Sequence, residues 1–139
     1  MNIKEYACIK IIELIPRIDA VSVHRVDSIL TELIDSGHTN IICDFSQNEY
    51  LSSAGLRSFL SALKRTKRVN SKLVLCALRP GVHEIFSMAG FTQLFTILES
   101  QKAAIDYLMD LEMLATQKEI IAKNYSAKPS PIRHLDEKI

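Results

Sequence analysis

The residues best placed for chemistry lie in one short segment, LSSAGL at 51–56. The segment stands between an apolar run with its loop and a helical pattern of leucines, so Ser52 and Ser53 are expected at the start of a helix. A serine there can cap the helix by accepting a backbone N–H bond. The same position suits a phosphoserine, because the positive end of the helix dipole tolerates a phosphate. The added charge of about −1.5 to −2 would expel a docked partner, and both interpretations stay open on the residues alone.

Gly55 follows in the first turn of the same expected helix. A glycine inside a helix lowers its stability by about 1 kcal/mol relative to alanine. Its presence indicates that a partner backbone or a neighbouring element of the chain approaches this turn closely.

Motifs of enzymes are absent from the sequence. It contains no GxxxxGK[ST], GxGxxG or HExxH pattern, and its four glycines are too few for a glycine-built phosphate cradle. The histidines are far apart, with no spacing of metal ligands or of a nucleophile–base pair, at His24, His38, His83 and His134. We therefore expect no catalytic residue, no bound metal and no cofactor.

Basic side chains form one cluster near the end of the helix expected over 53–69. The cluster contains Lys64, Arg65, Lys67, Arg68 and Lys72. Cations at a helix C-terminus complement the dipole, so a solvated helix end accounts for them. A docking patch for an acidic partner is the functional alternative.

The composition bounds the class of protein. The 139 residues suffice for one domain, and 47% apolar with 24% charged residues argues against bulk disorder. A net charge of +1 disfavours nucleic-acid binding by bulk charge. No apolar run approaches the ~20 residues of a membrane span, and the first residues lack a signal-peptide core. The three cysteines show no CxxC spacing, so the expectation is a cytoplasmic protein that does not insert into a membrane.

Apolar periodicity predicts alternating strands and helices. The expected elements, in chain order, are a strand over 8–15, a helix over 20–36, a strand over 40–45, a loop over 47–50, a helix over 53–69, a strand over 72–78, a short helix over 83–90, a strand over 93–98 and a helix over 100–122 that turns Ile105, Leu108, Leu111 and Leu114 inward. Helices between strands imply right-handed crossovers and a largely parallel sheet. From Asn124 onward, two prolines and scattered charge indicate a flexible tail.

Four segments in this order resemble the STAS family, and within it the bacterial anti-sigma factor antagonists. The segments are LIPRIDA at 14–20, similar to the family's Leu-x-Gly-x-(Leu/Ile)-Asp turn; IICDFS at 41–46, similar to its central strand; SSAGL at 52–56, similar to its serine-containing helix start; and LCALRPGV at 75–82 with FSMAGF at 86–91, similar to a later strand, turn and helix end. The resemblance runs from about Ile9 to Leu108. It implies an α/β fold with a single STAS-like domain over 1–110, whose mixed central sheet has about four or five strands with helices packed on it, and a C-terminal helical extension and tail over 111–139.

The resemblance also implies a function. In that family, the helix-starting serine is phosphorylated by a serine/threonine kinase that is itself the anti-sigma factor. The unphosphorylated antagonist binds this kinase and frees its client, and a PP2C-type phosphatase restores that form. Counting back from Gly55 places the phosphoacceptor at Ser53, with Ser52 as its rival. The docking face is then expected to include Asp19, Ser22, Tyr50, Leu51, Ser52, Ser53 and Gly55, with Tyr50 or an exposed Leu51 as the apolar anchor.

Two departures from the family pattern stand beside the likeness. Ser52 occupies the position of the family's Asp and so removes a negative charge next to the acceptor, and Pro16 replaces the common glycine of the first turn. These departures keep a second interpretation open, a STAS subunit that is not phosphorylated and docks constitutively in a membrane-linked transport or other regulatory complex. An enzyme is the third alternative and has no motif in its favour.

Overall fold

The computed structural model describes residues 1–127 and their side chains up to Asn124. Its strands are β1 (Asn2–Tyr6), β2 (Ile9–Glu13), β3 (Arg17–Ile18), β4 (Asn40–Asp44), β5 (Tyr50–Leu51), β6 (Lys72–Cys76) and β7 (Thr96–Leu98). Its helices are α1 (Val23–Asp35), α2 (Ser53–Arg68), α3 (Pro80–Met88), the 3-10 turn η1 (Phe91–Gln93) and α4 (Gln101–Ala127).

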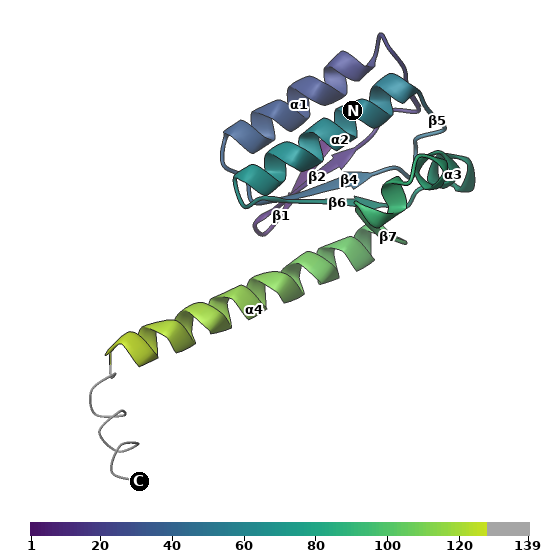
Figure 1. Cartoon of the computed structure of the whole chain (residues 1–139). Helices are drawn as coiled ribbons and strands as arrows, with labels where there is room; N and C mark the ends of the chain where they lie inside the picture. The colour runs from purple at the N-terminus through teal and green to yellow at the C-terminus, as the bar shows by residue number, and fades with distance from the viewer. Residues whose placement is uncertain (128–139) are drawn as a thin grey trace. The chain divides into compact units, whose positions relative to one another are not determined.

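Five of the strands form one mixed sheet in the order β1-β2-β4-β6-β7 (Figure 1). The pairs β2–β4, β4–β6 and β6–β7 are parallel, and only β1 runs antiparallel to its neighbour. The α/β fold with a mixed sheet of four or five strands is thereby confirmed. The parallel order follows from the helices that connect successive strands.

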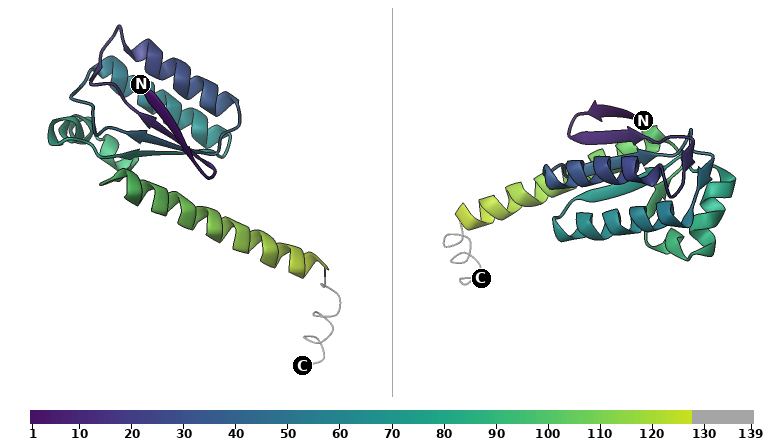
Figure 2. Two further views of the ribbon diagram at one scale, coloured as in Figure 1. Left: turned by 180° about the vertical axis from the view of Figure 1, so that it is seen from behind. Right: turned by 90° about the horizontal axis from the view of Figure 1, so that it is seen from above.

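The N-terminal strand β1 was not expected from the sequence. It forms a hairpin with β2, visible at the purple end of the chain in Figure 2. All five of its residues are exposed, so it carries no alternation of buried and exposed positions to mark it as a strand. The strand expected over 8–15 accordingly begins only at Ile9 and ends at Glu13.

Helices α1 and α2 lie side by side and cover one face of the sheet (Figures 1 and 2). The apolar positions expected on α1 are all buried there: Val23, Val26, Leu30, Leu33 and Ile34. On α2, Phe59 and Leu63 are buried, whereas Leu56 and Leu60 are half-buried. Tilted and edge-to-face contacts join Phe45 to Phe59 and Phe86 at centroid distances of 5.1 and 5.9 Å, so one aromatic cluster holds α2 and α3 to the end of β4.

Three further expectations need correction. The strand expected over 93–98 is a 3-10 turn followed by the short β7. Leu114, expected to point inward, is 54% exposed. Helix α4 continues through Asn124 to Ala127 where a flexible tail was expected, and the rest of that tail, 128–139, lies outside the described residues.

The chain divides into two compact units, the first being Met1–Asp106 and the second beginning at Tyr107. The boundary of the STAS-like domain at residue 110 stays a prediction. None of the helices in the described part of the chain is long and apolar enough to cross a membrane.

Candidate functional site

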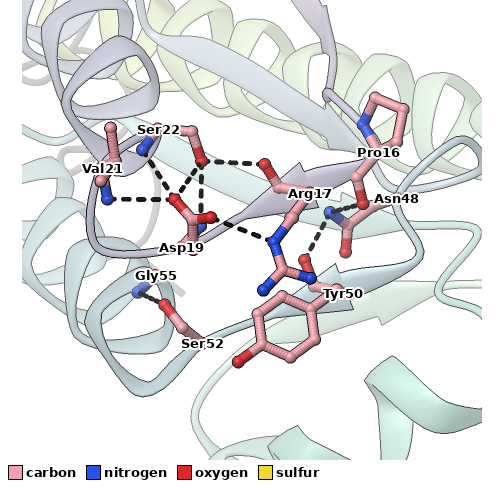
Figure 3. A network of polar contacts seen from close by, with 9 residues as sticks. All are labelled: Pro16, Arg17, Asp19, Val21, Ser22, Asn48, Tyr50, Ser52 and Gly55. Atoms are coloured by element: carbon pink, nitrogen blue, oxygen red, sulfur yellow. Dashed lines mark hydrogen bonds and ion pairs between the residues drawn. The ribbon is translucent and has the colours of Figure 1, made fainter.

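Strands β3 and β5 bring together the two segments that the sequence singled out. They pair in parallel, with Arg17 opposite Tyr50 and Ile18 opposite Leu51. The Ser52 N–H then donates to the Ile18 carbonyl oxygen at 2.9 Å. As a result, the turn after β3 and the start of α2 lie next to each other, as Figure 3 shows. The loop expected over 47–50 therefore ends in a strand at Tyr50.

Asp19 and Ser22 form a closed turn between β3 and α1. Asp19 Oδ1 accepts the backbone N–H groups of Ser22 and Val21 at 2.9 and 3.0 Å. The Ser22 hydroxyl accepts the Asp19 N–H at 2.9 Å and donates to the Arg17 carbonyl oxygen at 2.8 Å. The Ser22 side chain makes no cap bond to the following helix. Both side chains therefore fix the shape of this turn.

These contacts lower the pKa of Asp19 to about 2, chiefly through the Ser22 and Val21 N–H groups. We expect a carboxyl NMR titration to place it there, below the ordinary value of about 3.9. Because folding lowers this pKa, the carboxylate contributes stability above about pH 4, which is lost as the pH falls through about 2. Ser22→Ala keeps the backbone donors, so it should move the pKa only part of the way back. Titration of Asp19 at its ordinary pKa would mean that the turn is open in solution.

Arg17 belongs to the site and was missed as a site residue. Its guanidinium lies 4.2 Å from the centre of the Tyr50 ring, and its Nε donates to Asp19 Oδ2 at 3.1 Å. A cation over an aromatic face is attracted by the ring quadrupole. The contact holds the exposed Tyr50 ring against the Asp19 turn. No sequence signal links the two residues, because 33 positions separate them and only the β3–β5 pairing makes them neighbours.

Asn48 is the second missed residue and the internal support of the site. It is fully buried, and its Nδ2 donates to the carbonyl oxygens of Ile15, Pro16 and Tyr50 at 3.0, 3.3 and 3.1 Å. A single side-chain amide thus ties the segment before β3 to β5. A polar residue in the expected loop gave no hint of burial, because loops are ordinarily exposed.

The two serines at the start of α2 have different environments. Ser52 is the N-cap residue, is half-buried, and its Oγ accepts the Gly55 N–H at 3.2 Å. Ser53 is the first residue of the helix and is exposed. The Leu56 N–H bonds to the Ser52 carbonyl oxygen. Among the described residues, the N–H groups of Ser53 and Ala54 have no acceptor, as is usual in a first helical turn.

Two residues expected on the docking face are internal instead. Leu51 is 2% exposed, because alternation along β5 turns it into the core while Tyr50 points outward. Gly55 is also buried, and a Cβ atom there would lie 2.5 Å from Leu51 Cδ1 and 2.9 Å from Ile18 Cγ2. The close approach inferred from this glycine is therefore by a neighbouring element. Leu51 and Gly55 support the site and offer no surface to a partner.

The surface that remains consists of Tyr50, Ser53 and the Asp19–Ser22 turn, with Ser52 partly accessible. Within residues 1–127, no group of three or more His, Cys, Asp or Glu side chains is placed to hold a metal ion. The site presents a hydroxyl, a cation over an aromatic ring and a helix N-terminus. These groups suit recognition of a protein surface or acceptance of a phosphoryl group.

The chain is similar in sequence to known proteins. The STAS domain model matches residues 1–104. A protein of Bordetella bronchiseptica named as anti-sigma factor antagonist BtrV is 33% identical over 87 residues, which cover 63% of this chain and 75% of that protein.

Solved structures of low sequence identity share the fold. An anti-sigma factor antagonist from Thermotoga maritima superimposes with a TM-score of 0.71 at 16% identity, covering 76% of this chain and 92% of its own. The phosphorylated form of SpoIIAA, a Bacillus cell fate determinant, gives a TM-score of 0.64 at 19% identity over 77% of this chain and 97% of its own. The match over residues 1–104 and the Bordetella relative establish that the chain belongs to the STAS domain family and is of the anti-sigma factor antagonist type.

Proposed function

We propose that this protein is a phosphorylation-controlled binding switch whose phosphoacceptor is Ser53. The observation that supports the proposal is that the two adjacent serines have different environments. The Ser52 hydroxyl is engaged as the helix cap, whereas the Ser53 side chain is exposed at the first position of α2. A kinase can reach Ser53 without unwinding the helix. Phosphorylation of Ser52 would instead remove the cap, which is worth about 1 kcal/mol.

A phosphoryl group on Ser53 would be stable where it forms and disruptive to a docked protein. The unpaired N–H groups of Ser53 and Ala54, with the helix dipole, favour a negative charge at this point. The same group adds bulk and a charge of about −1.5 to −2 beside Tyr50 and the Asp19 turn. Binding in the unphosphorylated form and release in the phosphorylated form follow from these two effects.

The family indicates the class of partner, since anti-sigma factor antagonists act on anti-sigma factors. In our proposal, a serine/threonine kinase that is also the anti-sigma factor binds Tyr50, Ser52, Ser53 and the turn that Asp19 and Ser22 shape. A PP2C-type phosphatase would remove the phosphoryl group, and the cycle would run in the cytoplasm. The family is generally regulatory and non-enzymatic, and the protein would need no cofactor. SpoIIAA, solved in phosphorylated and unphosphorylated forms, supports the view that this fold can carry the modification.

The test is a pull-down from lysate of the source cells with wild type, Ser53→Ala and Ser53→Asp as baits. We expect a kinase-like regulator on wild type and Ser53→Ala and at least tenfold less on Ser53→Asp, about 1.4 kcal/mol or more. Ser28→Asp adds the same charge at an exposed serine of α1 and should leave capture unchanged. Incubation of the captured kinase with ATP should add one phosphoryl group to wild type and none to Ser53→Ala, measured by intact mass.

Three outcomes would count against the proposal. Equal capture by Ser53→Asp would show that charge at this position does not eject the partner. A phosphoryl group added to Ser53→Ala but lost in Ser52→Ala would assign the acceptor to Ser52. Equal retention of a transporter ATPase by every bait, with no phosphorylation, would identify a constitutive subunit of a membrane-linked complex.

A further inference from the structure

The solvent-facing side of α2 carries four positive charges. Residues three or four positions apart share one face of a helix, and this face presents exposed Arg57, Lys64, Lys67 and Arg68 in line with Ser53. The helix contains no Asp or Glu. We refer to these four cations as the basic stripe. Arg65 stands apart from it, because its guanidinium donates to Thr31 Oγ1 on α1 at 2.9 Å.

The charge of the basic stripe is not neutralised within the described part of the chain. Ion pairs there engage cations elsewhere, at Lys4, Lys10, Arg17, Arg79 and Lys102. None of them involves a member of the stripe. Four unpaired cations on one helix face create a local positive potential that a net charge of +1 for the whole chain conceals.

The surroundings of the stripe favour a protein partner over a nucleic acid or a membrane. Half-buried Leu56 and Leu60 lie on the same side of α2 as the cations, and Leu60 stands between Arg57 and Lys64 in the sequence. A protein interface combines an apolar core with a polar rim, and the leucines and cations of α2 supply both kinds of group. The neighbouring α1 exposes Glu32 and Asp35 as well as Arg25. Its two carboxylates would repel a polyanionic duplex or an anionic bilayer beside the stripe.

We propose that the basic stripe docks an acidic, partly apolar surface of the partner regulator, and that Arg57 couples this surface to Ser53. Arg57 stands four residues after Ser53, which places the two side chains on adjacent turns of one face. A phosphoryl group on Ser53 would pair with its guanidinium by charge-assisted hydrogen bonds. The modification would then withdraw the nearest cation from the partner as well as repel it. This inference rests on the proposed function for the role of Ser53.

The test measures binding of a fluorescein-labelled acidic copolymer of glutamate and tyrosine to the whole purified chain by anisotropy at low salt. We expect Lys64→Glu/Arg68→Glu to bind at least about tenfold more weakly than wild type. Arg25→Glu/Lys118→Glu reverses one arginine and one lysine at exposed positions on other helices, and it should bind like wild type. Rising salt should weaken wild-type binding, because exposed charges are screened.

The coupling through Arg57 is tested with the same probe. Ser53→Asp should weaken binding about twofold, and should have a smaller effect in the Arg57→Gln background. Equal effects in both backgrounds would overturn the role of Arg57. If Lys64→Glu/Arg68→Glu, the double charge reversal, binds the copolymer as tightly as wild type, the basic stripe is not a docking surface.

Other outcomes separate this inference from the proposed function. If the chain binds duplex DNA or phosphatidylserine vesicles more tightly than the copolymer, the partner of the basic stripe is a nucleic acid or a membrane and the proposed acidic protein is wrong. If Ser53→Asp releases the regulator in pull-downs while the double reversal still binds the copolymer, the switch stands and the basic stripe is not its docking surface. If the double reversal abolishes copolymer binding while Ser53→Asp captures the regulator like wild type, the stripe stands and the switch is wrong.

Discussion

Asn48→Asp should destabilise the fold by about 3–5 kcal/mol at pH 7, the cost of an uncompensated buried charge. The new carboxylate would replace a donor that now serves the carbonyl oxygens of Ile15, Pro16 and Tyr50. Oxygen would then face oxygen in a fully buried position. Because this amide ties the segment before β3 to β5, the Ser53 site should lose its shape as well. Urea denaturation followed by circular dichroism measures the loss.

The pH dependence of this variant has a defined sign. Burial among carbonyl oxygens should raise the pKa of the introduced carboxyl above its unfolded value of about 3.9. The folded state then binds more protons, so the variant loses stability as the pH rises through the raised pKa. The difference from wild type should be smaller at pH 4.5 than at pH 7. Gln47→Glu makes the same chemical change at an exposed neighbour, and a comparable loss there would contradict the role given to Asn48.

Phe45→Ala should cost about 3–5 kcal/mol, because it empties a close-packed position in the core. Phe45 is 0% exposed and lies against the rings of Phe59 on α2 and Phe86 on α3. Its removal loosens both helices where they meet the end of β4. Against a typical total stability of about 5–15 kcal/mol, this loss is large enough to unfold part of the population at 37 °C. Thermal and urea unfolding of the purified variant measure it.

The control for Phe45 is Phe91→Ala. Phe91 is half-buried and stands at the edge of the same cluster, 6.1 Å from the centre of the Phe95 ring. Its loss should cost less than half as much, since fewer atoms leave the interior. If both variants lose the same free energy of unfolding, Phe45 contributes no more to the aromatic cluster than Phe91 does at its edge.

The candidate site shows why part of the sequence-based prediction succeeded. Ser52, Ser53 and Gly55 are close in sequence, and local rules of helix capping and glycine cost apply to them directly. The structure confirms the helix start at Ser53 and a close approach at Gly55. Of the two side chains that approach Gly55, Leu51 is four positions away in the sequence, whereas Ile18 reaches it only through the pairing of β3 with β5. Local rules could not indicate the contact with Ile18.

The sequence by itself determined the α/β class, the order of the main helices and strands, and the family. Each of these properties depends on local periodicity or on short motifs, and both can be recognised within a short stretch of the sequence. Only the tertiary structure decided that Arg17 lies over Tyr50, that Asn48 is a buried support and that Leu51 faces the core. Those facts depend on contacts between segments more than 30 positions apart. They also depend on which side chain of the two-residue strand β5 points to solvent and which points to the core. A one-residue shift in such a strand exchanges its faces, so no local pattern in the sequence could specify them.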